Sequence, residues 1–146
     1  MDRPVTGSEE DATASPHRLV NPDALERPSG YAHAVVPVQG RTIYVAGQTA
    51  HGTDGSLPGE GIVEQFDAAA AHVVIALEAA GARPEHLVSL QIFVTDLDGY
   101  LADSKAIGRA YRAHFGRHFG ATALVEVSRL AGEAKVELIC VAVVPE

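Results

Sequence analysis

Apolar residues recur along this chain with helical spacing in two segments. Between residues 62 and 80 they recur every three to four positions, which predicts an amphipathic helix, and Gly81 supplies a C-terminal stop. A second helix is expected to start at a cap provided by Asp96 or Asp98 and to run to about Phe115. The pattern therefore predicts two helices that each bury one side.

Other apolar runs are β-branched or alternate strictly with polar residues, and they predict strands. These runs span residues 31–38, 41–46, 87–95, 123–129 and 135–144. The Gln39-Gly40 pair separates the first two runs and favours a hairpin between them, whereas residues 47–61 are rich in turn formers and predict a loop. The order of elements predicts an α+β fold, a sheet with both helices packed on one face.

The last predicted strand is apolar on both of its faces. One face carries Val136, Leu138, Cys140 and Ala142, and the other carries Ile139, Val141 and Val143. The helices can cover only one face. Either a further copy of the chain covers the other in a closed oligomer, or the sheet curls over its own inner face, and the pattern leaves both possibilities open.

Length and charge restrict the class of protein. Residues 1–17 lack hydrophobic periodicity and are expected to form a disordered tail, which leaves residues 18–146 as one domain. The formal net charge of −8, with no cluster of basic residues, argues against nucleic acid as a partner. Neither a signal peptide nor a run of about 20 apolar residues is present, so a cytoplasmic protein is expected.

Motifs for metals, phosphates and nucleophiles are weak in this sequence. His114 and His118 stand one helical turn apart, but Gly116 between them is expected to end the helix, which favours a surface pair over a metal site. The single cysteine, Cys140, is expected to be a buried thiol. No phosphate-binding glycine motif and no nucleophile elbow is found.

Glu137 is the one polar residue within residues 136–144, on the face of Ile139 and Val141. Apolar surroundings disfavour the charged form of a carboxylate, which suits it to moving a proton or holding a catalytic water. The alternative is a strand-end carboxylate that reaches solvent or pairs with Arg129. The residues alone leave both roles open.

Tyr31 and His33 lie two positions apart on a predicted strand, so their side chains project to the same side. A phenol and an imidazole placed together can bind a polar ligand. A histidine on a strand is more often simply hydrogen-bonded or solvated. Tyr31 is therefore expected to be a wall of a ligand site, and His33 a secondary candidate.

Several short runs, taken in order, resemble the RidA (YjgF) family of enamine and imine deaminases. They are the segments at 30–35, 43–48, 94–98, 121–127, 129–130 and 136–138. The resemblance extends from Arg18 to Val144. It implies a chorismate-mutase-like α+β fold, a barrel-like homotrimer with pockets between subunits, and no cofactor or metal.

The resemblance also implies roles for individual residues. Glu137 matches the carboxylate that holds or activates water, Tyr31 matches the pocket tyrosine, and Gly47 matches a glycine whose backbone lines the pocket. The segment between Tyr31 and Gly47 is about two residues longer than in the family. A different placement of these extra residues puts His33 at the tyrosine position.

Three positions depart from the family pattern. Thr122 stands at the position of the arginine that clamps the substrate carboxylate, Leu124 at that of the cysteine, and Asp98 at that of the junction asparagine. Threonine cannot form a bidentate ion pair, so the resemblance predicts a hydrolase of an imine or enamine other than a simple α-imino acid. A non-catalytic trimer that binds a small molecule or a protein is the alternative, and the charge disfavours ribonuclease activity.

Overall fold

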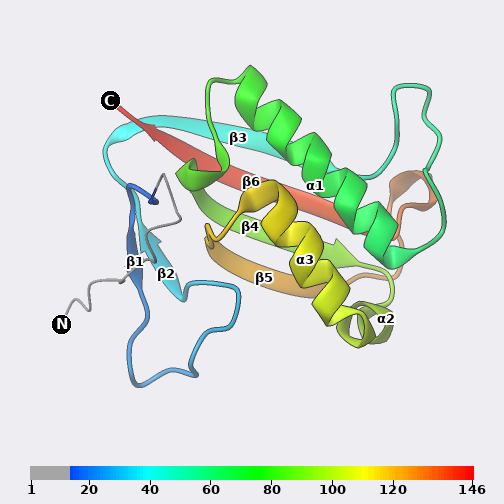
Figure 1. Cartoon of the computed structure of the whole chain (residues 1–146), viewed down its shortest axis with the longest axis horizontal. Helices are drawn as coiled ribbons and strands as arrows, with labels where there is room; N and C mark the ends of the chain where they lie inside the picture. The colour runs from blue at the N-terminus through cyan, green and yellow to red at the C-terminus, as the bar shows by residue number, and fades with distance from the viewer. Residues whose placement is uncertain (1–13) are drawn as a thin grey trace.

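A four-stranded mixed sheet runs through the molecule, and all the helices lie on one of its faces (Figure 1). The computed structural model describes residues 14–146. In spatial order the strands are β3 (Gly40–Gln48), β6 (Val136–Pro145), β4 (Leu87–Val94) and β5 (Ala121–Glu126). Strand β6 pairs antiparallel with β3 and β4, whereas β4 and β5 are parallel. The predicted α+β class is confirmed.

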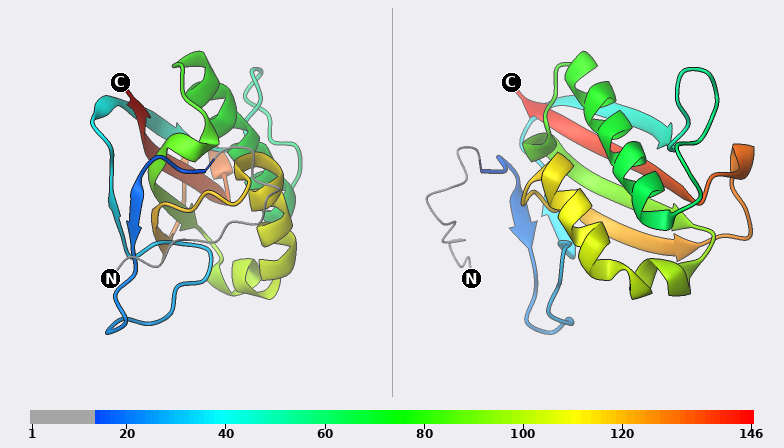
Figure 2. Two further views of the ribbon diagram at one scale, coloured as in Figure 1. Left: turned by 60° about the vertical axis from the view of Figure 1, so that its left-hand side comes forward. Right: turned by 45° about the vertical axis from the view of Figure 1, so that its right-hand side comes forward.

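The helices share a face because of the way the chain connects the parallel strands. Helix α1 (Ile62–Ala79) joins β3 to β4, and helices α2 (Leu97–Ala102) and α3 (Ser104–Phe115) join β4 to β5. Both connections step across the sheet in the same direction between parallel strands. Right-handed crossovers then place both connections on the same side of the sheet, as the two views of Figure 2 show.

Helix α1 ends as its sequence predicts. Gly81 has a φ of +86°, its N–H donates to the carbonyl of Glu78, and the N–H of Ala82 donates to the carbonyl of Leu77. These two bonds form a Schellman motif, for which glycine is the favoured residue. The polar Gln65 is fully buried on the sheet-facing side, where its amide donates to Gly59 O and accepts from Lys135 N.

The second predicted helix is two helices. Asp96 is the N-cap, and its carboxylate accepts from the N–H of Gly99 at 3.0 Å, but the first helix lasts only six residues. The chain bends at Asp103 before α3 continues to Phe115. Gly99 and Gly108 lower the helical preference of this segment.

The predicted hairpin between residues 31–38 and 41–46 is wrong. Strand β2 (Ala34–Val36) pairs instead with β1 (Arg18–Val20), and β3 pairs with β6. Gly40 is not among the glycines with positive φ, so it does not serve as a turn residue. A Cβ at this position would lie 1.9 Å from the carbonyl oxygen of Val144. Glycine is required there for close contact with the last strand.

The described part of the chain includes residues 14–17, which lie before the predicted domain boundary at residue 18. His17 is buried, its Nδ1 accepts from the N–H of Val38 at 3.2 Å, and its Nε2 lies 3.0 Å from the carbonyl oxygen of His86. This side chain ties the β1–β2 pair to the main sheet. The rest of the predicted tail, up to residue 13, lies outside the described residues.

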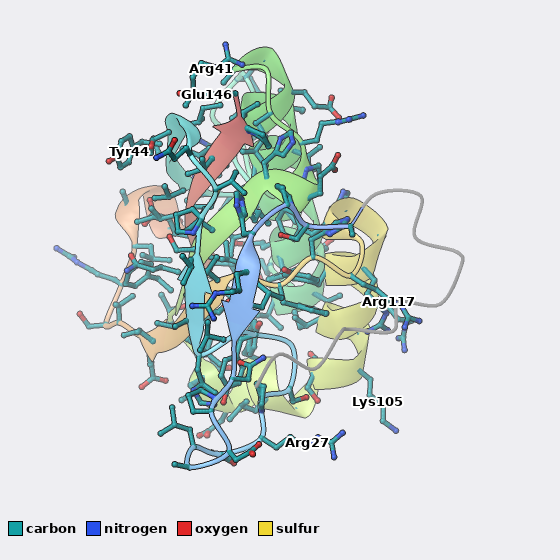
Figure 3. The ribbon with its side chains drawn as sticks, turned by 90° about the vertical axis from the view of Figure 1, so that its left-hand side faces the viewer. Arg27, Arg41, Tyr44, Lys105, Arg117 and Glu146 are labelled. Atoms are coloured by element: carbon teal, nitrogen blue, oxygen red, sulfur yellow. The ribbon has the colours of Figure 1, made fainter. Side chains whose placement is uncertain are left out.

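The face of the sheet opposite the helices is only half covered. Along β6, Val136, Leu138, Cys140 and Ala142 are buried under the helices, whereas Glu137, Ile139 and Val141 are half-buried on the other face. Figure 3 shows Tyr44 of β3 on this face, on the opposite side of the sheet from Lys105 and Arg117. No helix within residues 14–146 is long and apolar enough to cross a membrane.

Candidate functional site

A hollow of about 330 Å³ lies on the face of the sheet opposite the helices. It is lined by Tyr31, Ala32, His33, Ser89, Gln91, Ala121, Thr122 and Ala123. The structure therefore brings together Tyr31, His33 and Thr122 among the residues predicted from the sequence. A larger open groove of about 630 Å³ lies between α1 and α3 and contains none of the predicted site residues.

Strands β4 and β5 form the floor of this hollow. Their parallel register pairs Ser89 with Ala121 and Gln91 with Ala123, so these four side chains project to the same face. The alanines are small and leave the polar groups of β4 accessible. The floor is thus a flat apolar surface with two polar side chains on it.

Tyr31 and His33 form one wall of the hollow. Between them, the N–H of Ala32 donates to the carbonyl of Gly120 at 3.0 Å, which fixes this segment beside the start of β5. The two rings meet edge to face with centroids 5.2 Å apart, so the prediction that they share one side is confirmed. The Nε2 of His33 is 2.6 Å from the carbonyl oxygen of Glu26.

Glu137 lies on the same face as the hollow, one step along the strands. It pairs with Phe93 in the β4–β6 ladder, and Gln91 pairs with Ile139. Gln91 and Glu137 are therefore diagonal neighbours, a relation that separates Cα atoms by roughly 7–8 Å. A ligand in the hollow can extend from the Gln91 amide to the Glu137 carboxylate.

The Glu137 carboxylate rests over Gly47. A Cβ on Gly47 would lie 2.2 Å from Glu137 Oε1, so this side chain occupies the space that any other residue would fill. The β3–β6 register shifts between Val45 and Gln48, which marks a bulge at Gly47. Within residues 14–146 no hydrogen bond or ion pair engages the Glu137 carboxylate, and the alternative pairing with Arg129 is not formed.

Thr122 and Leu124 do not contribute side-chain chemistry to the hollow. In register they pair with Leu90 and Ile92, whose side chains are buried under the helices. The Thr122 hydroxyl donates to the carbonyl of Gly120 at 2.9 Å, and Leu124 is not among the lining residues. The position that the resemblance assigns to an anchoring arginine therefore holds no cation and no unengaged donor.

Asp98 is also outside the hollow, on the exposed side of the first turn of α2. The histidine pair behaves as a surface feature, because His114 Nε2 meets Asp67 Oδ1 at 2.8 Å. Among residues 14–146 no group of three histidine, cysteine or acidic side chains gathers as a metal would require. Cys140 is buried on the helix side, where burial raises the pKa of its thiol to about 12.

Ser89 and Gln91 are the site residues that the sequence analysis missed. In the sequence they are simply the polar positions of an alternating strand, a pattern that equally describes a solvated sheet face. The signal that identifies them is spatial, since only the β4–β5 register places them beside Tyr31. Within the part of the chain that the structure describes, no arginine or lysine lines the hollow.

Comparisons with known proteins agree with this architecture. Residues 22–144 match the family described as endoribonuclease L-PSP. A Rid family protein from Yersinia pestis, YyfB, is 30% identical, with a TM-score of 0.77 over 88% of this chain and 98% of that one. The YjgF gene product from E. coli is 30% identical, with a TM-score of 0.61 over 77% of this chain and 87% of that one.

A member of the YjgF/YER057c/UK114 family from Mycobacterium tuberculosis is 34% identical to this chain. Its TM-score is 0.57, over 79% of this chain and 87% of that one. No curated protein matches the sequence.

Proposed function

Because this chain belongs to the Rid family, described as endoribonuclease L-PSP, we propose that it is a hydrolase of reactive imines or enamines. The observation that supports this proposal is the Glu137 carboxylate. It is half-buried over Gly47, has no hydrogen-bonding partner within residues 14–146, and lies diagonally across from a hollow that holds Tyr31. A carboxylate in this position is free to accept a hydrogen bond from water.

The proposed reaction needs one proton acceptor and one water molecule. Glu137 takes a proton from the water as the water oxygen bonds to the imine carbon, and this proton passes to the nitrogen, which gives an amino alcohol. Glu137 then transfers the hydroxyl proton of the amino alcohol to the nitrogen, the C–N bond breaks with its electron pair going to the nitrogen, ammonia or an amine leaves, and a carbonyl product remains. An enamine enters the same route after protonation at carbon. No step requires a cofactor or a metal.

The substrate is proposed to be something other than a simple α-imino acid. A carboxylate on the substrate would be held best by an arginine fork, and no arginine among the described residues 14–146 lines the hollow. Ribonuclease activity is disfavoured, since the net charge is −8 and phosphate contacts dominate nucleic-acid affinity.

A homotrimer is proposed as the working assembly, with hollows at the boundaries between subunits. The supporting observation is the half-covered sheet face, on which Ile139 and Val141 are half-buried and Tyr44 is exposed. Apolar surface of this kind, next to the hollow, fits coverage by a further copy of the chain.

Hydrolysis is tested by ammonia and carbonyl release from imines generated in situ by an oxidase. The imines include amino-acid-derived and carboxylate-free ones, and the proteins are the wild type, Glu137→Gln and the matched control Glu60→Gln, a change in an exposed loop. We expect turnover that Glu137→Gln lowers at least about a hundredfold, the usual contribution of a general base, and that the control retains. No turnover of any imine by the wild type would leave a non-catalytic binder as the better assignment.

A further inference from the structure

The hollow contains hydrogen-bonding groups that the protein itself leaves unused. Within residues 14–146 neither the Gln91 amide nor the Ser89 hydroxyl makes a hydrogen bond. Gln91 is exposed and Ser89 half-exposed, on the floor beside the alanines of β5. A primary amide offers both a donor and an acceptor in one plane, so it can bind a group with the complementary pair.

Two other polar side chains of the hollow, those of Thr122 and His33, are already engaged in hydrogen bonds. The Thr122 hydroxyl donates to Gly120 O, and the His33 ring bonds to Glu26 O. Among residues 14–146, no lysine, arginine, aspartate or glutamate lines the hollow. These lining residues therefore offer no charged partner to a ligand, but they do offer neutral hydrogen-bonding groups.

We propose that Gln91, assisted by Ser89, binds an uncharged amide-type group of the ligand, such as a carboxamide or a lactam. The amide carbonyl accepts from Gln91 Nε2, and its N–H donates to Gln91 Oε1. The planar group lies on Ala121 and Ala123, with the Tyr31 ring as its wall. This inference deepens the proposed function, on which it rests for the identity of the reaction.

The position of Glu137 indicates how the ligand is oriented, with its amide end at Gln91 and its other end towards the carboxylate. From Gln91 the Glu137 carboxylate is one diagonal step away on the same sheet face, roughly 7–8 Å between Cα atoms. A ligand anchored through its amide thus places an atom a few bonds away near the carboxylate. Gln91 is then a specificity-determining residue, and Glu137 the group that acts on the reacting atoms.

The test compares two probes of nearly the same shape, benzamide and benzoate, in NMR titrations of the full-length protein. We expect benzamide to shift the amide signals of residues 89–91 and 121–123. Benzoate, which lacks the N–H donor and carries an uncompensated charge, should bind at least about fivefold more weakly, the value of one net hydrogen bond.

Variants test whether Gln91 is the residue that binds benzamide. Gln91→Leu keeps the volume and should weaken benzamide binding about fivefold or more, while Gln39→Leu, in the exposed connection before β3, should not change it. Gln91→Lys should reverse the preference towards benzoate. Equal affinity for the two probes, absence of binding, or an unchanged affinity in Gln91→Leu would each overturn the proposal.

The experiments distinguish a failure of the proposed imine hydrolysis from a failure of the proposed amide site. The titrations need no turnover, so a protein that binds benzamide through Gln91 and hydrolyses no imine keeps this inference and loses the hydrolase. A protein that hydrolyses imines with no response to Gln91→Leu, in binding or in KM, keeps the hydrolase and loses the amide site.

Discussion

At the scale of single residues, the position of the Glu137 carboxylate depends on the absence of a side chain at Gly47. The bulge in β3 brings the Gly47 backbone under the carboxylate, and the missing Cβ provides the space in which Oε1 lies. A carboxylate supported by backbone on one side and open on the other has few alternative rotamers. Its direction is thus set by the neighbouring strand.

Gly47→Ala tests this dependence. The new Cβ would lie 2.2 Å from Glu137 Oε1, so the carboxylate must rotate away from its position. We expect imine turnover to fall about tenfold or more, which corresponds to roughly 1.4 kcal/mol of activation free energy. The melting temperature should change little, because the displaced group is the end of a flexible side chain.

Gly52→Ala is the matched control, since its Cβ would meet nothing closer than 3.4 Å. Steady-state kinetics and thermal unfolding of the two variants make the comparison. Wild-type turnover in Gly47→Ala would show that the direction of Glu137 does not matter.

Sequence reasoning at this scale succeeds where alternation alone decides orientation. It places Glu137 on the face of Ile139 and Val141, and it pairs Tyr31 with His33. It misses Ser89 and Gln91, because which face of a strand meets a hollow depends on its register with another strand. That register comes from packing and cannot be derived from a strand in isolation.

At the scale of elements, His17 ties the β1–β2 pair to the rest of the protein, and the His86 ring closes the short helix of residues 84–86 against which His17 lies. His17 bridges Val38 N and the carbonyl of His86, and the Nδ1 of His86 accepts from the N–H of Arg83 at 3.0 Å. Each ring uses one nitrogen as an acceptor, which only the neutral imidazole provides. Protonation removes both acceptors.

Mild acid should therefore loosen this part of the fold. Burial lowers the pKa of His86 below its ordinary 6.5; Glu85 opposes the shift, and Arg83 reinforces it. The unfolded chain then binds more protons than the folded one, so stability decreases as the pH falls through about 6.5. Thermal unfolding from pH 8 to 5 should show this decrease.

His86→Gln keeps a neutral acceptor that does not titrate, and its melting temperature should fall less over the same range. His33→Gln, which retains a donor for Glu26 O, is the control and should follow the wild type. Identical pH profiles for the wild type and His86→Gln would contradict this origin of acid sensitivity.

Prediction of the elements is accurate for helix α1, misses the break between α2 and α3, and is poor for the connection between β2 and β3. Helical periodicity gives α1 almost to the residue, with its glycine stop. The hairpin is missed because Gln39-Gly40 has the composition of a turn, while Gly40 actually provides close contact with β6, a strand about 100 residues away along the chain. Local composition carries no information about so distant a partner.

At the scale of the whole molecule, the two faces of the sheet differ in what covers them. Helices bury most of one face. The other face exposes Tyr44, 79% of which is accessible, beside a half-buried apolar row that includes Ile139 and Val141. The doubly apolar pattern of β6 indicates from sequence alone that both faces favour burial, but it does not say what covers the second face.

Sedimentation equilibrium should give a mass of about three chains of 15.3 kDa for the wild type. Tyr44→Lys places a charge on the proposed interface and should shift the protein towards monomers, with loss of turnover. Ile75→Lys is the matched control, because Ile75 is 63% exposed but lies on the helix side. A monomeric wild type would refute the trimer, and equal dissociation of both variants would refute this interface.

The central position of β6 has a consequence for the synthesis of the protein. This strand lies between β3 and β4, so these two strands stay unconnected until residues 136–145 are available, although β4 can already pair with β5. During synthesis the four-stranded sheet therefore cannot close before residues 136–145 have left the ribosome. Until then the apolar sides of β3, β4 and α1 lack the strand they pack against, and exposed apolar surface of this kind promotes aggregation.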